Sequence, residues 1–417
     1  MKITVLAIGT VGSVRPFVAL GNGLAKAGHQ VTVASSSNMS DLIRASGSLG
    51  YHVVTGNTER WTAWLSGGRS RERHSVLMAK LLRKPSGFQP MLDELFTATL
   101  DAARGSDIVI SSAPGFCIGQ PVAKRVGALH VSGFLQPFHA TAGFPQMFWP
   151  ELPETVRHGR AAYNRMTYRV TFAALRAMFG RGVAAARRRA LGADSVGYRA
   201  DPLVLYGFSS ALVPRPPDWA DPVHITGYWS EPEPAGWRPP AELAEFVAAG
   251  PPPVYVGLGS LAQIRPEIMD LAAAAVRRLG QRAVIATGWS GWRPREPDGR
   301  LYVTDAVPHS WLFPRVSAVV HHGGVGTIGA GLGAGCPTVT MPVMYDHFFF
   351  CRQVFNRGAG PRPLPFRRVT VAELSRAVLA ATGDGRMRAS ARALAARIAT
   401  EDGVSHAVEL VEKYASR

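Results

Sequence analysis

Short apolar runs of strand length alternate along this chain with amphipathic stretches of helix length. Residues 3–8 form one such run, residues 9–15 contain two glycines typical of a turn, and Pro16 suits the first position of a helix. Gly28 ends that helix, and an apolar run at 30–34 resumes a strand. Strand, helix and strand in this order predict a parallel sheet.

The same alternation continues through both halves of the chain and predicts an α/β fold class. Further strand-like runs cover 107–113, 129–135, 253–260, 282–288, 301–307, 317–324 and 337–343. Helices are predicted at 373–399 and 404–414. We therefore expect two Rossmann-like doubly wound domains facing across a cleft, where such sheets bind ligands.

A proline-rich segment marks the expected boundary between the halves. Residues 213–240 contain eight prolines, too many for a long helix or a central strand. We place an acceptor-side domain at 1–212, a linker at 213–240 and a second domain at 241–400. A C-terminal helix at 401–417 could pack back on the first domain.

Composition narrows the setting of the protein. The 417 residues contain three widely spaced cysteines, which predict neither disulfides nor a zinc site, and no signal or membrane-spanning run is apparent. We expect a cytoplasmic protein. The net charge of +17 comes from 46 basic and 29 acidic residues, but no nucleic-acid-binding motif accompanies it, so nucleic acid is not an expected partner.

Part of the positive charge is concentrated in one segment. Ten arginines and a single acid, Asp194, lie between Arg157 and Arg199. The segment could be the solvated face of one or two helices, or a cationic surface that contacts anionic lipid. The second alternative would make the protein peripheral at a membrane.

A glycine-rich turn follows the predicted strand at 317–324. It reads His321-His322-Gly323-Gly324-Val325-Gly326-Thr327 and precedes a segment of small residues. Backbone N–H groups of such a turn, together with the helix N-terminus, favour a diphosphate. The string is neither a Walker A motif nor GxGxxG, and alone it could be a packing feature.

The residues from His321 to Pro365 resemble the donor-binding signature of family 1 glycosyltransferases with the GT-B fold. The resemblance is to sterol glucosyltransferases and to bacterial enzymes that glycosylate glycopeptide and polyketide antibiotics in natural product biosynthesis. The strings GYW (227–229), WRPP (237–240), VYVGLGS (254–260) and ATGW (286–289) agree in order. The resemblance is specific in the C-terminal half, whereas residues 50–210 agree with the family only in general layout.

The resemblance implies an inverting, metal-independent transfer from a UDP- or dTDP-sugar to a hydroxyl of a hydrophobic small molecule, with no cofactor and no metal ligand. The chain also shows no D-x-D in a suitable position. Residues carried over to the donor site hold the diphosphate, the base or the sugar: Gly259, Ser260, Trp289, Val307, His322, Gly323, Gly324, Val325, Gly326, Thr327, Asp346 and His347.

Some of these positions have alternative interpretations. Asp346-His347 departs from the family's Asp-Gln, which puts the sugar preference in doubt, and Asp346 could instead cap a helix. Trp289, Trp292 and Trp311 could line the donor pocket or pack in the core; core packing is preferred for Trp311.

The catalytic base is open. The family carries an Asp or His at the position of Ser13, and a serine hydroxyl is too weak a base to act alone. His139 is an alternative base, with His130, Asp41 and Asp107 as weaker ones. Otherwise the acceptor is acidic enough, like a phenol, to need little help, or the chain binds nucleotide sugar without transferring it well.

An aromatic segment, 134–153, is expected to bind a flat lipophilic acceptor, although it could equally cover a core edge. Its candidate residues are Phe134, Phe138, Phe144 and Phe148. Two other classes of function stay open: a nucleotide-sugar-binding helper protein, motivated by Ser13, and a nucleotide-sugar epimerase.

Overall fold

The fold is described from a computed structural model of the 417-residue chain. It describes residues 1–57, 89–153, 155–156, 158–193, 195, 202–231, 236–258, 265, 267–294 and 298–416. Gly259, Ser260, Arg157, Asp194 and Arg199 lie outside the described residues, as do the side chains of Trp289 and Tyr345.

The chain divides into two compact units. The first contains residues 1–208, 215–230 and 402–417, and the second contains 209–214 and 231–401. Each unit is built on a sheet in which all the paired strands are parallel, as the alternation of apolar runs and amphipathic segments predicted. The α/β fold class is confirmed.

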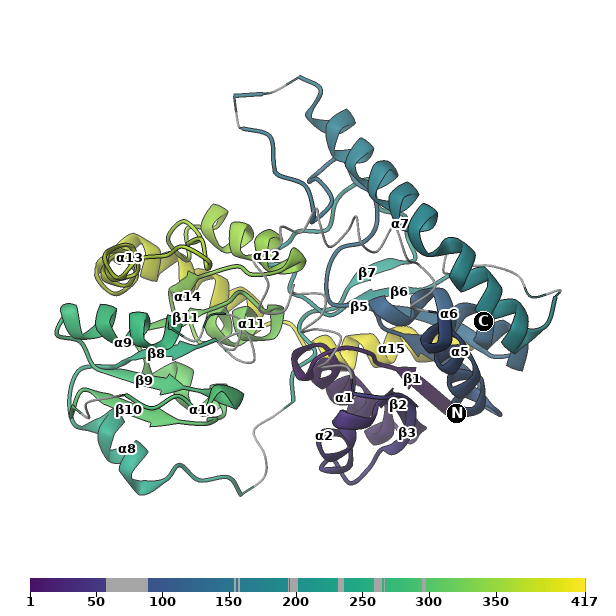
Figure 1. Cartoon of the computed structure of the whole chain (residues 1–417), viewed down its shortest axis with the longest axis horizontal. Coiled ribbons are helices and arrows are strands. Elements are labelled where there is room, and N and C mark those ends of the chain that lie inside the picture. Colours follow the sequence, from purple (N-terminus) through teal and green to yellow (C-terminus); the bar gives the residue numbers. More distant parts are fainter. Residues whose placement is uncertain are drawn as a thin grey trace. The chain divides into compact units, whose positions relative to one another are not determined.

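The first unit holds a seven-stranded sheet in the order β3-β2-β1-β4-β5-β6-β7 (Figure 1). Its strands are β1 Lys2–Leu6, β2 Gln30–Ser36, β3 Gly50–Thr55, β4 Ile108–Ser111, β5 Leu129–Phe134, β6 Val204–Tyr206 and β7 Val223–Ile225. Its helices are α1 Val11–Lys26, α2 Ser40–Arg44, α5 Gln89–Ala103, α6 Phe116–Val126, α7 Arg160–Leu191 and α15 Gly403–Ala415.

The second unit holds a five-stranded sheet in the order β10-β9-β8-β11-β12. Its strands are β8 Val254–Gly257, β9 Ala283–Ala286, β10 Leu301–Thr304, β11 Ala318–His321 and β12 Thr338–Thr340. Its helices are α8 Ala241–Ala248, α9 Ile268–Arg278, α10 His309–Leu312, α11 Val325–Gly333, α12 Tyr345–Asn356, α13 Val371–Gly383 and α14 Gly385–Ile398.

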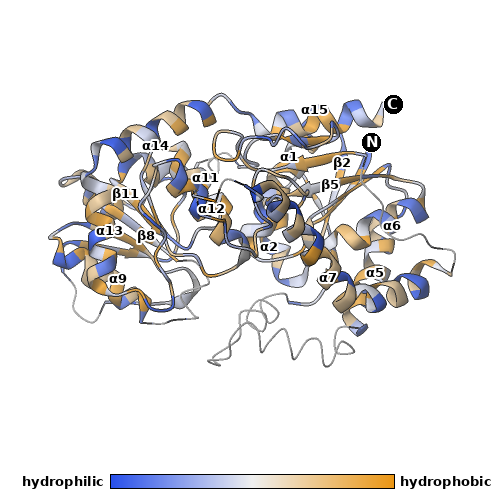
Figure 2. Cartoon of the chain, turned by 90° about the horizontal axis from the view of Figure 1, so that it is seen from above, coloured by the Kyte–Doolittle hydropathy of each residue, from blue (hydrophilic) through white to orange (hydrophobic). Residues whose placement is uncertain are grey.

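Helices cover both faces of the sheets, which explains why the strands are apolar without alternation. In Figure 2 the strands β8 and β11 are mostly hydrophobic, whereas α14 and α15 carry hydrophilic residues on one side. All four residues of β4, β8, β9 and β11 are buried. The core of each unit therefore lies between its sheet and its helices.

The start of the first helix was predicted wrongly. The structure begins α1 at Val11, with Thr10 as N-cap and the Val14 N–H donating to the Thr10 carbonyl at 3.0 Å. Pro16 lies inside the helix, where its missing N–H leaves only the Gly12 carbonyl without its helical donor. The predicted turn at 9–15 is thus mostly helix.

Two further boundaries differ from the prediction. The segment 213–240 is not a linker throughout, because β7 pairs with β6 as an edge strand, a position that tolerates proline. The helix predicted at 373–399 is two helices, because Asp384 accepts hydrogen bonds from the backbone N–H groups of Arg386 and Met387 and caps α14.

The C-terminal helix α15 belongs to the first unit and packs on α1. A Cβ at Gly23 of α1 would lie 2.3 Å from Val404, so the two helices approach closely there. His29 Nε2 also lies 3.0 Å from Glu412 Oε1. At Gly403 a Cβ would lie 2.5 Å from the backbone of Gly227, so the GYW string forms part of this contact.

Candidate active site

The strand order places one ligand-binding position in the second unit. In the order β10-β9-β8-β11-β12, the connections leave β8 and β11 in opposite directions, and ligands of open α/β sheets bind at the carboxyl ends of such a strand pair. The glycine-rich turn 322–324 directly follows β11, and Leu258 directly follows β8. The predicted phosphate turn therefore lies at the switch point of its sheet.

The geometry of this turn requires glycine. Gly323 has φ +95, and a Cβ there would lie 2.2 Å from Cys351 Sγ. Gly324 is the N-cap of α11, and the Ile328 N–H donates to the Gly324 carbonyl at 3.0 Å. The amides of Val325, Gly326 and Thr327 precede that bond, so they have no acceptor within α11 and can meet an anion.

Two histidine rings lie beside the turn. The rings of His322 and His347 are 4.9 Å apart. Burial lowers the pKa of His322 to about 3 and that of His347 to about 4, so both rings are neutral at pH 7. A diphosphate at this turn would meet N–H donors and a helix N-terminus, with no charge from these two rings.

His347 replaces the family's Gln with a ring in a defined tautomer. The Met344 N–H donates to His347 Nδ1 at 3.4 Å in the first turn of α12. Because Nδ1 accepts, the proton of the neutral ring is on Nε2. His347 thus offers one N–H donor, whereas a Gln amide would offer two donors and a carbonyl acceptor.

Asp346 is the second residue of α12, whose N-cap is Met344, so it is not the capping residue. Burial raises the pKa of its carboxyl to about 6, and the backbone N–H groups of Asp346 and His347 oppose that rise. A carboxylate held this way at pH 7 is a strong acceptor for sugar hydroxyls.

Two further residues considered for the donor pocket, Val307 and Trp311, pack against other side chains of the second unit. Val307 is buried and packs in the core cluster of Tyr255 and Phe313, so its side chain is a core residue. Trp311 packs edge-on against Trp237, with ring centroids 5.7 Å apart, as preferred from the sequence.

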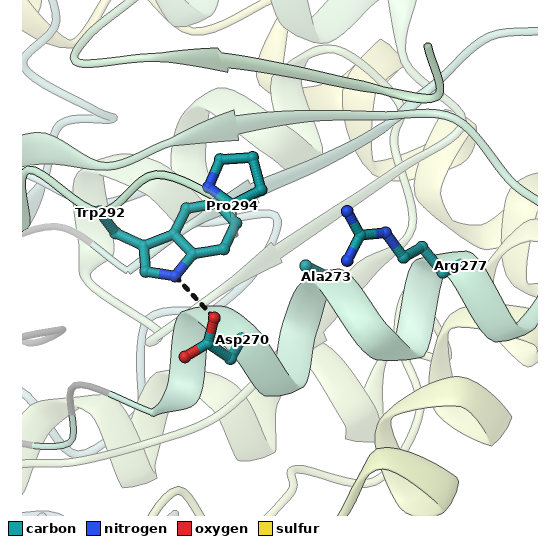
Figure 3. A pocket seen from close by; sticks show the side chains of 5 residues that line it. All are labelled: Asp270, Ala273, Arg277, Trp292 and Pro294. Carbon is teal, nitrogen blue, oxygen red and sulfur yellow. Dashed lines mark hydrogen bonds between the residues drawn. The ribbon is translucent and has the colours of Figure 1, made fainter. Parts of the chain in front are cut away.

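A separate hollow of about 340 Å³ lies on α9 (Figure 3). Trp292 and Pro294 line it together with Asp270, Ala273 and Arg277, and Trp292 Nε1 donates to Asp270 Oδ1 at 3.0 Å. Trp292 therefore packs against α9. None of the predicted phosphate-turn residues lines this hollow.

In the first unit, Ser13 lies at the corresponding switch point, between β1 and β4. It is the third residue of α1, and its Oγ is 3.4 Å from Thr10 Oγ1. A Cβ at Gly9 would lie 2.8 Å from Ser13 Cβ, which explains why glycine precedes this turn. This contact joins two hydroxyl groups, so it supplies no base to activate Ser13.

His139 is held by Tyr206, a residue that the sequence did not point to. The Tyr206 hydroxyl oxygen accepts from the backbone N–H groups of Phe138 and His139 at 2.9 and 3.0 Å, and it lies 2.7 Å from His139 Nδ1. Burial raises the pKa of Tyr206, so the phenol keeps its proton and donates it to Nδ1. The Nδ1 atom of His139 is therefore engaged by the Tyr206 hydroxyl.

The structure also shows where the three weaker candidates for the catalytic base lie. His130 is buried in β5, where its Nε2 lies 3.0 Å from Ser111 Oγ. Asp107 precedes β4 and accepts from the Lys2 N–H at 2.7 Å, at the amino edge of the sheet, opposite to the edge that binds ligands. Asp41 is in the first turn of α2.

The aromatic residues predicted for the acceptor divide into core and surface. Phe134 is 3% exposed and packs against Phe138 with ring centroids 5.2 Å apart, so Phe134 is a core residue. Phe144 meets Trp219 edge-on at 6.3 Å, and Trp219 stacks on Tyr206. Phe148 is 46% exposed and is the one of the four on the surface.

Comparison with known proteins gives two family matches. Residues 3–99 match the family described as glycosyltransferase family 28 N-terminal domain, and residues 295–413 match erythromycin biosynthesis protein CIII-like, C-terminal domain. Together they cover more than half of the chain. The chain belongs to the GT-B glycosyltransferases.

Relatives and a solved structure agree with this family. A sterol 3-beta-glucosyltransferase of Emericella nidulans is 32% identical over 99% of this chain and 30% of that protein. One of Arabidopsis thaliana is 32% identical over 99% of this chain and 66% of that protein. The glycosyltransferase VinC in complex with DTDP superposes with a TM-score of 0.66 at 18% identity, over 100% of both chains.

The chain therefore spans about a third of the fungal relative and about two thirds of the plant relative. Within the described residues, no helix of this GT-B protein is long and apolar enough to cross a membrane.

Proposed function

We propose that this GT-B protein transfers a sugar from a nucleotide diphosphate sugar to a hydroxyl of a hydrophobic small molecule. The observation that carries the proposal is the glycine turn of α11, whose first-turn amides have no acceptor within the helix and lie beside two neutral histidines. The names of the relatives, sterol 3-beta-glucosyltransferases, support glucose and a sterol as the first pair to test. The dTDP in VinC supports testing dTDP-sugars as well.

The chemistry is an inverting displacement. The acceptor oxygen forms a bond to the anomeric carbon, while the bond from that carbon to the β-phosphate oxygen breaks and its electron pair leaves with the nucleotide diphosphate. The amides of α11 and the His322 and His347 rings stabilise that charge, and Asp346 holds sugar hydroxyls. Because fixed N–H dipoles supply this stabilisation, we expect transfer to continue in EDTA.

Among the described residues, we identify no clear destination for the acceptor proton. Ser13 occupies the base position of the family, and His139 has its Nδ1 bonded to Tyr206. We therefore propose that turnover is fastest with acidic acceptors such as phenols, which need little proton removal in the transition state.

We also propose that α7 contacts an anionic membrane surface. This 32-residue helix contains eight arginines and no acid. Arg165 and Arg189 pair with Asp218 and Asp93, whereas Arg169 and Arg176 are exposed. Two apolar side chains of the same helix, Met166 and Val170, are 40% and 43% exposed. Clustered basic side chains near a membrane surface are attracted by anionic lipid headgroups.

Vesicle co-sedimentation tests the membrane contact. Arg169→Glu with Arg176→Glu should abolish binding to phosphatidylserine vesicles, whereas Arg386→Glu with Arg388→Glu on α14, also exposed, should not. Equal binding by both double variants would contradict the contact.

The alternative is a helper protein that binds nucleotide sugar without transferring it, favoured by Ser13. Nucleotide release distinguishes the two when the protein is incubated with UDP-glucose or dTDP-glucose and either a sterol or a phenolic polyketide. Release that depends on the acceptor, and a product of inverted anomeric configuration by NMR, supports the transferase. Binding of UDP or dTDP that His322→Ala abolishes, without release for any pair, supports the helper protein.

A further inference from the structure

A second buried histidine precedes His322 and has no role in the donor assignment above. His321 is the last residue of β11 and is 0% exposed. Its Nδ1 accepts a hydrogen bond from the Gly323 N–H at 3.0 Å. The side chain of one residue thus holds the backbone of the turn two residues later.

The tautomer of this ring follows from its surroundings. Burial, and next to it the neighbouring rings of His322, His309 and His347, hold the pKa of His321 well below its ordinary value. The ring is therefore neutral, and because Nδ1 accepts, its proton is on Nε2. Nε2 has no hydrogen-bond partner among the described residues.

A buried N–H without a partner destabilises the folded protein, so packing alone does not explain this histidine. An apolar side chain of similar size would fill the same space without that cost. What such a side chain could not do is accept the Gly323 N–H.

That bond has a consequence for the donor site. Gly323 adopts φ +95, a conformation that the chain must hold against alternatives open to glycine. With its N–H fixed on His321, the peptides that follow, from Gly324 to Thr327, keep one orientation at the start of α11. Preorganised donors bind a developing charge without reorganising.

We propose that His321 is a positioning residue for the donor diphosphate, acting through the Gly323 amide. The inference rests on the proposed donor site. It assigns His321 a task distinct from that of His322, which contacts the phosphate in that proposal.

Two substitutions separate positioning from packing. In His321→Asn, the side-chain oxygen can accept the Gly323 N–H in place of Nδ1; in His321→Leu, nothing can. Calorimetric Kd values for UDP and dTDP, with the melting temperature of the free protein, are measured for both variants and the wild type.

We expect His321→Leu to raise the Kd of the nucleotide that the wild type binds by about tenfold, as the loss of one hydrogen bond predicts. Its melting temperature should stay close to that of the wild type, because removal of the unpartnered Nε2–H offsets the loss of the acceptor for the Gly323 N–H. His321→Asn should stay within about threefold of the wild-type Kd.

Wild-type affinity in His321→Leu, or equal losses in both variants, would overturn the inference. So would a loss of affinity in His321→Leu that is matched by a lower melting temperature, because that result indicates a purely structural role. If the wild type binds neither nucleotide, the donor site itself is wrong, and the failure is that of the proposed function.

Discussion

Three residues of the candidate site differ from the family pattern or from the usual behaviour of their side chain. Ser13 stands where the family has a base, and His347 stands where it has Gln. Asp346 is held as a carboxylate although burial raises its pKa to about 6. Ser13 and Asp346 each lead to a separate measurement.

Ser13→Asp should raise kcat for a sterol acceptor. A carboxylate at this position supplies the missing base, and general bases contribute roughly 10²- to 10⁴-fold. An acid also suits the third position of α1, near its positive N-terminus. Ser13→Asn is the matched control, with the same shape and no basicity. Equal rates for the two variants would show that the base lies elsewhere.

Asp346→Asn should stabilise the protein at neutral pH while impairing donor use. Because the folded pKa of about 6 lies above the ordinary 3.8, the folded protein binds more protons than the unfolded chain between these values. The stabilising contribution of this group therefore falls as pH rises from 3.8 to 6. We expect the variant to gain about 2 kcal/mol in free energy of unfolding at pH 7.5 and almost nothing at pH 3.5.

Urea unfolding of variant and wild type at both pH values measures that difference. A gain that is the same at the two pH values would contradict the raised pKa, since it would then come from packing. In the same variant, the KM for the sugar donor should rise, because an amide replaces a charged acceptor of hydroxyl groups.

At the scale of elements, the decisive piece is the connection from β11 to α11. Gly323 must be glycine, because its φ is +95 and a Cβ would meet Cys351 Sγ at 2.2 Å. Gly326, three residues later, has open space around the position of a Cβ. The two glycines therefore differ although the sequence presents them alike.

Gly323→Ala should lower the free energy of unfolding by about 2 kcal/mol or more, from backbone strain and the sulfur contact. Gly326→Ala should leave it unchanged or raise it by a few tenths of a kcal/mol, as a better helix former. Urea unfolding of both variants checks this pair. A Gly326→Ala variant as unstable as Gly323→Ala would show that the turn does not distinguish them.

Most elements could be predicted from the sequence because buried parallel strands are continuous apolar runs. The boundary errors arose where the neighbouring structure outweighed the local preference of a single residue. Pro16 suggested a helix start but is tolerated inside α1, and Asp384 divides an amphipathic stretch by capping α14. Among the candidate site residues, the turn that we propose for the phosphates stands out in the sequence by its glycines. Tyr206, which holds His139, has no such signal, because it belongs to a strand of three apolar residues.

The molecule as a whole consists of two parallel-sheet units, with the C-terminal helix α15 belonging to the first. The positive charge is not gathered at the phosphate turn, where the rings of His321, His322 and His347 are neutral. It is dense on α7, in the other unit. The proposed donor site and the densest positive charge therefore lie in different units.

The central claim is that the protein moves a sugar from a nucleotide diphosphate held at the α11 turn. Mass spectrometry of the acceptor tests it most directly, after incubation of wild type and His322→Ala with a sterol or phenolic acceptor and UDP-glucose or dTDP-glucose. We predict that an acceptor gains one hexose with the wild type and at least about a hundredfold less of it with His322→Ala. No hexose on any acceptor, or equal product from both proteins, would contradict the account.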